Sequence, residues 1–131
     1  MDKVSIIVRT CGRPEVLRGA LESIRKQTYP DVETVVIEDG LEISRQMICT
    51  EYSDLQLRYI STGKRVGRAK AGNLGMKVAQ GKYLNFLDDD DVLYPEHIEI
   101  LLQTLQSAEE KAVYSVAEEA AAIYRKRKGT F

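Results

Sequence analysis

Four consecutive aspartates, Asp88–Asp91, are the residues of this chain whose types and spacing best suit chemistry. They follow an apolar run, Tyr83 to Leu87, whose length and sharp polar boundary predict a buried strand. Neighbouring carboxylates repel one another, and a divalent cation with oxygen ligands removes that cost. Because side chains alternate between the faces of a strand, Asp88 and Asp90 are expected to point the same way. A solvated acidic turn without a cation is the alternative that these four residues leave open.

The rest of the chain alternates predicted strands with predicted helices, and these must position the acidic turn. Strands are predicted at residues 4–9, 32–37, 57–60, 83–87 and 112–116. Helices are predicted from Pro14 to near Gln27, weakly over 41–52, over 71–79 with Gly81 as the C-terminal cap, from Pro95 past Leu105, and at the start of 118–131. Apolar strands alternating with helices predict an α/β fold, a three-layer α/β/α Rossmann-like arrangement around a mostly parallel sheet.

Polar residues that follow separate strands should meet at one edge of this sheet. Thr10, Asp39 and Asp88–Asp91 each follow a predicted strand, and the ligand crevice of a parallel sheet lies outside the carboxyl ends of its strands. A cation beside a nucleotide-sized crevice suits a nucleoside diphosphate. Mg²⁺ or Mn²⁺ would bridge its phosphates to the carboxylates and would stabilise charge on a diphosphate leaving group.

Composition and missing motifs exclude several other classes of protein. With 131 residues and a net charge of −1, the chain predicts one soluble domain and no nucleic-acid partner. It has no P-loop and no G-x-G-x-x-G motif, and its single histidine, His97, excludes a Ser/His/Asp triad. Its two cysteines and the lack of a long apolar segment predict a cytoplasmic protein without a transmembrane segment. Peripheral association with the inner membrane face is left open.

Four segments, in order, resemble the motifs of family 2 glycosyltransferases, which have the GT-A fold. Residues 4–14 are similar to the opening strand and turn of the family, and Glu38-Asp39-Gly40 is similar to its Asp-Asp-Gly turn. Residues 71–83 resemble its Ala-Arg-Asn-x-Gly…Ala-x-Gly-x-Tyr segment, and residues 86–91 match its DxD metal motif. The resemblance covers residues 4 to about 116. It implies the nucleotide-sugar-binding half of a GT-A enzyme.

The resemblance also implies a reaction. The domain would bind an NDP-sugar, commonly a UDP-sugar, with Mn²⁺ or Mg²⁺. A hexosyltransferase of this kind transfers the sugar, with inversion, to a hydroxyl of a saccharide, a lipid-linked acceptor or another acceptor. Asp88 and Asp90 would form the metal site, with Asp90 as the direct ligand. The residues implied to contact the donor are Thr10, Arg13, Asp39, Arg68, Asn73 and Asp89.

Structural roles compete with some of these assignments. Asn73 would also serve as a helix-packing hydrogen-bond partner, Arg68 as a solvated charge, and Asp39 as a turn-former before Gly40. Glu38 stands where the family has an aspartate. Gly72 stands where it commonly has an arginine, and Arg68 or Lys70 is expected to supply the missing cation.

The domain boundaries follow from the same comparison. We expect a single domain over residues 1–131, with a core over about 1–117 and a helical, basic tail over 118–131. We expect the acceptor-binding half, and with it the catalytic general base, to lie outside this chain. A non-catalytic GT-A-like interaction module that uses the basic residues 125–128 is the alternative function. A phosphatase-like enzyme with an aspartate nucleophile in Asp88-x-Asp90 fits poorly, since such a nucleophile normally follows the first strand.

Overall fold

A computed structural model of the chain describes residues 1–107. The chain divides into two units, residues 1–99 and residues 100–131, and the sheet belongs to the first. The predicted strand at 112–116 and the predicted tail at 118–131 lie outside the described residues. Within residues 1–107, no helix is both long enough and apolar enough to span a bilayer.

Four parallel strands form the sheet, in the order β3-β2-β1-β4. The strands are β1 (Val4–Thr10), β2 (Val32–Glu38), β3 (Leu57–Ser61) and β4 (Tyr83–Asp88). In the registers, Thr10 of β1 pairs with Glu38 of β2, and Arg9 pairs with Asp88 of β4. The carboxyl ends of these three strands therefore lie side by side, as predicted for a parallel α/β sheet.

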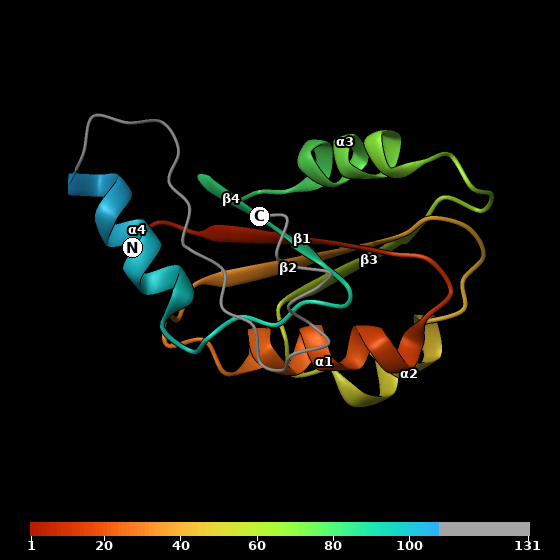
Figure 1. Cartoon of the computed structure of the whole chain (residues 1–131), viewed down its shortest axis with the longest axis horizontal. Coiled ribbons are helices and arrows are strands. Elements are labelled where there is room, and N and C mark those ends of the chain that lie inside the picture. Colours follow the sequence, from red (N-terminus) through yellow and green to blue (C-terminus); the bar gives the residue numbers. More distant parts are fainter. Residues whose placement is uncertain (108–131) are drawn as a thin grey trace, which may run out of the picture. The chain divides into compact units, whose positions relative to one another are not determined.

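Helices cover both faces of the sheet and complete three layers. The helices of the first unit are α1 (Pro14–Arg25), α2 (Arg45–Glu51) and α3 (Arg68–Val78), and α4 (His97–Ser107) begins in that unit. Figure 1 shows α1 and α2 on one face of the sheet and α3 on the other. Each strand-to-strand crossover thus passes through a helix, the arrangement that parallel strands require.

The two central strands are buried, whereas β4 is only partly buried. Every residue of β1 except Arg9 is buried, as the predicted apolar strand requires. The prediction that residues 83–87 form a buried strand is wrong in this respect: only Leu87 is buried, and Leu84 and Phe86 are 45% and 48% exposed. The reason is position, because β4 pairs with one strand among those described and lies at the edge of their sheet.

Two glycines permit close packing of backbone against neighbouring atoms. A Cβ on Gly75 of α3 would lie 2.5 Å from Cγ2 of Ile7, so α3 sits close to β1. Gly81 is not the helix cap that the sequence predicted, since α3 ends at Val78 and is capped at Ala79. Its lack of a side chain instead admits the backbone of β1, because a Cβ there would lie 2.6 Å from the Ser5 nitrogen.

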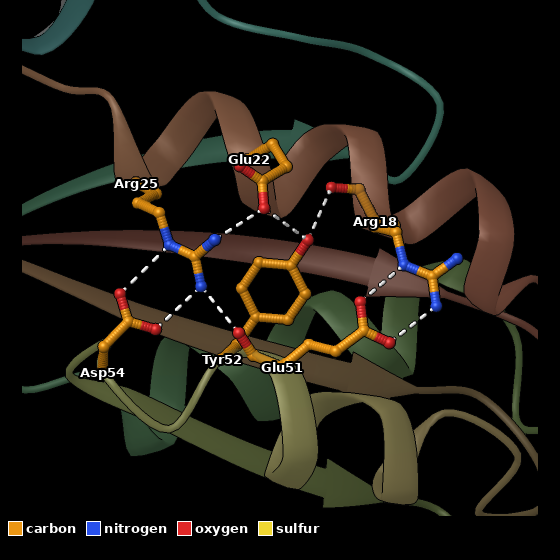
Figure 2. Close-up of polar contacts among 6 residues, drawn as sticks. All are labelled: Arg18, Glu22, Arg25, Glu51, Tyr52 and Asp54. Carbon is orange, nitrogen blue, oxygen red and sulfur yellow. Dashed lines mark hydrogen bonds and ion pairs between the residues drawn. The ribbon is translucent and has the colours of Figure 1, made fainter.

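On the face of the sheet opposite to α3, polar contacts join α1 to α2 and to the residues that follow α2 (Figure 2). The Arg25 guanidinium pairs with Asp54 and stacks over the Tyr52 ring at 4.6 Å. Burial and a hydrogen bond donated to Glu22 raise the pKa of Tyr52 to about 12. Arg18 donates two hydrogen bonds to Glu51. This network fixes α2 against α1.

The remaining helix boundaries differ slightly from those predicted. The last helix begins at His97 rather than Pro95, because the His97 N–H bonds the Tyr94 carbonyl in a turn that precedes it. The weakly predicted segment 41–52 contains α2, which is seven residues long.

Candidate functional site

Three turns meet at the carboxyl edge of the sheet and form the candidate site. The first follows β1 at Thr10, the second follows β2 at Asp39, and the third follows β4 at Asp88. The Asp39 N–H bonds the Thr10 carbonyl at 2.8 Å, which joins the first two turns directly. The sequence-based expectation that these distant residues share one edge is confirmed by the strand order.

The acidic turn gathers three of its four carboxylates. The strand ends at Asp88, and the Asp91 N–H bonds the Asp88 carbonyl at 3.0 Å, which closes a turn. One carboxylate oxygen from each of Asp88, Asp90 and Asp91 lies within 4.8 Å of the others. Asp88 and Asp90 do come together, but through this turn and not through strand alternation. Asp91, which belongs to the acidic run but was not predicted as a metal ligand, is the third member.

This cluster fits a hard divalent cation. Mg²⁺ binds oxygen at about 2.1 Å, so opposite ligands of one ion lie about 4.2 Å apart. The three carboxylate oxygens lie within 4.8 Å of one another, which is close to this greatest separation of two ligands on one ion. Carboxylate oxygens are also the donor type that Mg²⁺ and Mn²⁺ prefer.

Asp88 is paired with two arginines from different elements. Arg9 Nη2 of β1 lies 3.0 Å from Asp88 Oδ1, and Arg68 Nη2, at the start of α3, lies 3.6 Å from the same oxygen. The sequence analysis expected Arg68 near the site and did not foresee Arg9. The only sequence signal for Arg9 is its place at the end of β1, one residue before Thr10.

Asp89 points the other way, into the turn that follows β1. Its side chain is 4% exposed, and it accepts a 2.8 Å hydrogen bond from the Thr10 hydroxyl. Arg13 contacts both carboxylate oxygens of Asp89. These hydrogen bonds raise the pKa of the Arg13 guanidinium, which stays half-exposed. Three residues predicted to contact a donor are therefore brought together, and here they contact one another.

Asp39 holds the loop that leads into α3. Its two oxygens accept hydrogen bonds from the Val66 and Gly67 N–H groups at 2.7 and 3.0 Å. The Val66 bond is the main reason that the pKa of Asp39 lies below its ordinary value, although burial opposes the shift. Asp39 thereby fixes the start of the helix that carries Arg68. Gly67 adopts a positive φ of 99°, which a residue with a side chain rarely adopts.

Glu38 is wholly buried and acts as a structural tie between turns. It accepts hydrogen bonds from the Gly12 N–H at 3.1 Å and from the Ser44 N–H at 2.8 Å. The Ser44 and Tyr59 hydroxyls donate to it as well. Burial and the hydrogen bond that its hydroxyl donates to Glu38 raise the pKa of Tyr59. The longer reach of glutamate lets one carboxylate hold the turns after β1 and β2.

Asn73 and Gly72 both lie on α3. Asn73 is exposed, and within residues 1–107 no hydrogen bond joins it to the other predicted site residues. Gly72 is buried, and a Cβ there would lie 3.7 Å from Arg9 Cδ. The space beside Gly72 is thus bordered by Arg9, while Lys70, which was expected to supply a cation, lies exposed.

Comparison with known families decides what kind of protein carries this site. The profile described as "Glycosyl transferase family 2" matches residues 5–128. The chain belongs to glycosyl transferase family 2. The predicted resemblance to this family is therefore confirmed.

Several curated relatives are named as glycosyltransferases of bacteria. Glycosyltransferase GlyG of Streptococcus pneumoniae is 30% identical over 114 residues, which cover 86% of this chain and 38% of GlyG. An uncharacterized glycosyltransferase of Rickettsia felis is 40% identical over 107 residues, covering 79% of this chain and 17% of that protein. The chain thus spans well under half the length of these relatives.

Two solved structures share the fold. TarS of S. aureus, residues 1–349, in complex with UDP-GlcNAc, matches with a TM-score of 0.73 and 27% identity, over 80% of this chain and 31% of TarS. The mannosyltransferase PcManGT of Pyrobaculum calidifontis, in complex with GDP-Man and Mn²⁺, matches with a TM-score of 0.64 and 25% identity, over 70% and 28% of the two chains. The α/β sheet described above is therefore the GT-A fold.

Proposed function

We propose that this chain is the donor-binding part of a glycosyltransferase and binds a UDP-sugar together with Mn²⁺ or Mg²⁺. The observation that carries the proposal is the cluster of Asp88, Asp90 and Asp91 beside the turns that follow β1 and β2. The UDP-GlcNAc complex of TarS and the GDP-Man and Mn²⁺ complex of PcManGT support a nucleotide sugar and a divalent cation as ligands of this fold.

The residues at the sheet edge divide the work of binding. Asp88, Asp90 and Asp91 would hold the cation, which when bound neutralises phosphate charge and stabilises the diphosphate as it leaves. Asp39 and Thr10 border the nucleoside side of the edge. Arg68 lies exposed at the start of α3, and the basic residues 64–65 lie exposed on the loop that Asp39 holds. There they can attract a diphosphate.

The proposed reaction of the whole protein is transfer of the sugar to an acceptor hydroxyl with inversion at the anomeric carbon. This step needs a general base that deprotonates the acceptor. We assign no such base among residues 1–107. The roles of Arg13, Asn73 and Asp89 in donor binding are part of the same proposal. For Asp89, contact with a donor would require the Arg13 and Thr10 hydrogen bonds to rearrange.

Calorimetric titration with UDP, with and without Mn²⁺, tests the proposal. We expect the wild-type chain to bind UDP at least about tenfold more tightly with Mn²⁺ present. Asp90→Ala should remove most of that gain, because losing even an outer-shell partner of a metal ligand typically costs about 10- to 100-fold in affinity, and Asp90 is proposed as a direct ligand.

Glu96→Ala is the matched control, since Glu96 is exposed, close in sequence and outside the carboxylate cluster. It should behave like the wild type. UDP affinity that is the same with and without Mn²⁺ would refute the metal site. A titration with GDP in parallel tests the choice of uracil.

A further inference from the structure

Arg9 is held more firmly against Asp88 than an ordinary surface arginine would be. It lies on β1, which is paired on both sides, and its Cα is the register partner of the Asp88 Cα on β4. Its side chain is 26% exposed, and Nη2 lies 3.0 Å from Asp88 Oδ1. Since Arg9 and Asp88 are 79 positions apart in sequence, the sheet itself creates this pair.

A second, longer contact engages the other nitrogen of the guanidinium. Arg9 Nη1 donates to the backbone carbonyl of Arg68, the first residue of α3, at 3.4 Å. The Arg9 stem passes alongside α3 at Gly72, because a Cβ there would lie in ordinary van der Waals contact, 3.7 Å, with Arg9 Cδ. Arg9 thus links the end of β4 to the start of α3.

Arg68 contacts the same oxygen in a weaker way. Its side chain is 76% exposed, and its Nη2 lies 3.6 Å from Asp88 Oδ1. Exposed pairs of this kind contribute little and are screened by salt. Arg68 is therefore the more exposed and more distant of the two cations that face Asp88, and Arg9 is the closer and less exposed one.

We propose that Arg9 is a positioning residue for the carboxylate cluster. Arg9 holds Asp88 through Oδ1, and its charge weakens the binding of a divalent cation in the absence of nucleotide. The inference rests on the proposed function, because it concerns the same cation site. A positive charge fixed beside Asp88 opposes a second cation. The negative charge of a diphosphate offsets that opposition, so the cation and the nucleotide bind in synergy.

Titration of Mn²⁺ alone, followed by the electron paramagnetic resonance signal of the free ion, tests this role. Arg9→Gln removes the charge and keeps a hydrogen-bond donor, and it should bind Mn²⁺ on the order of tenfold more tightly than the wild type at low salt. Arg9→Met is a second neutral variant whose apolar stem keeps the packing against Gly72. Arg9→Lys keeps the charge and should stay within about twofold of the wild type.

Arg18→Gln is the matched control. Arg18 is 35% exposed and pairs with Glu51 on the α1–α2 face, so this variant changes the net charge equally, away from the carboxylate cluster (Figure 2). It should leave Mn²⁺ affinity unchanged, and Arg68→Gln should give a smaller increase than Arg9→Gln.

Mn²⁺ affinity that is unchanged or weaker in folded Arg9→Gln and Arg9→Met would overturn the role of Arg9. The role of Arg9 is also overturned if no variant binds Mn²⁺ without UDP while the wild type binds Mn²⁺ with UDP. The proposed function would stand after that result. Failure of the wild type to bind Mn²⁺ even with UDP would overturn the cation site itself.

Discussion

Glu38 and Asp39 are adjacent at the end of β2, and their carboxylates have different structural roles. Glu38 is fully buried and accepts hydrogen bonds from the turn after β1, from the start of α2 and from β3. Asp39 faces the loop before α3 and accepts two backbone N–H groups. Glu38 ties together the scaffold, and Asp39 places the basic loop beside the carboxylate cluster.

Asp39→Asn should lower the free energy of unfolding by about 2 kcal/mol at pH 7, since one amide N–H₂ would face the backbone N–H groups that the carboxylate now accepts. The pKa of Asp39 lies below its ordinary value of 3.8. Its stabilising contribution is therefore full above pH 4 and is lost as the pH falls through the lower, folded pKa. Urea unfolding at pH 7, 5 and 3 should show the difference between the two proteins shrinking only at the acid end.

Asp54→Asn provides the comparison for this experiment. Asp54 also pairs with a donor, Arg25, but its side chain is 58% exposed, and exposed pairs contribute little. We expect almost no change in stability at any of the three pH values. A difference between wild type and Asp39→Asn that grows toward acid would contradict the role assigned to Asp39.

At the scale of elements, the end of β4 and the start of α3 form the site together. The strand stops at Asp88 and turns, so three carboxylates gather on one side while Asp89 enters the turn after β1. Helix α3 begins at Arg68, beside the same carboxylates. The depth at which α3 lies on the sheet therefore helps to set where Arg68 stands.

Gly75→Ala should raise α3 from the sheet and destabilise the chain by about 1–2 kcal/mol. The added Cβ would meet Ile7 Cγ2 at 2.5 Å, and overpacking of this kind costs about 1–3 kcal/mol. The better helix propensity of alanine returns up to about 1 kcal/mol. Chemical denaturation measures the difference.

Gly19→Ala is a matched substitution on another helix. Nothing lies within 4 Å of a Cβ at Gly19 of α1, so only the propensity term remains. We expect this variant to be more stable than the wild type by about 0.5–1 kcal/mol. A loss of stability in Gly75→Ala together with a gain in Gly19→Ala would support the close packing of α3 on the sheet. A gain of stability in Gly75→Ala would contradict it.

For the whole molecule, the periodic pattern of apolar residues was enough to predict the α/β fold, because parallel strands and their crossover helices leave strong local signals. The common edge of Thr10, Asp39 and the acidic turn also followed, since strand ends in a parallel sheet share an edge. The exposure of Phe86 did not follow, because a run of apolar residues carries no information about which strand lies at an edge.

The ion-pair and hydrogen-bond partners of the acidic residues could not be predicted from the sequence either, because they depend on how distant segments pack. The pairing of Arg9 with Asp88 depends on the register between two strands that are far apart in sequence. The burial of Glu38 depends on three separate segments that converge on it. Residue types alone marked these side chains as charged, and only the packed sheet shows which of them neutralise one another.

The central claim is that segments distant in sequence form one nucleotide site, and a nuclear magnetic resonance titration of the ¹⁵N-labelled chain with UDP and Mg²⁺ tests it most directly. We predict that the amide signals that shift most belong to residues 10–13, 39–41, 66–68 and 88–91. Replacing Mg²⁺ with Mn²⁺ should broaden residues 88–91 first, because paramagnetic relaxation falls steeply with distance from the ion. Shifts confined to the α1–α2 face, or the same shifts without any divalent cation, would contradict the account.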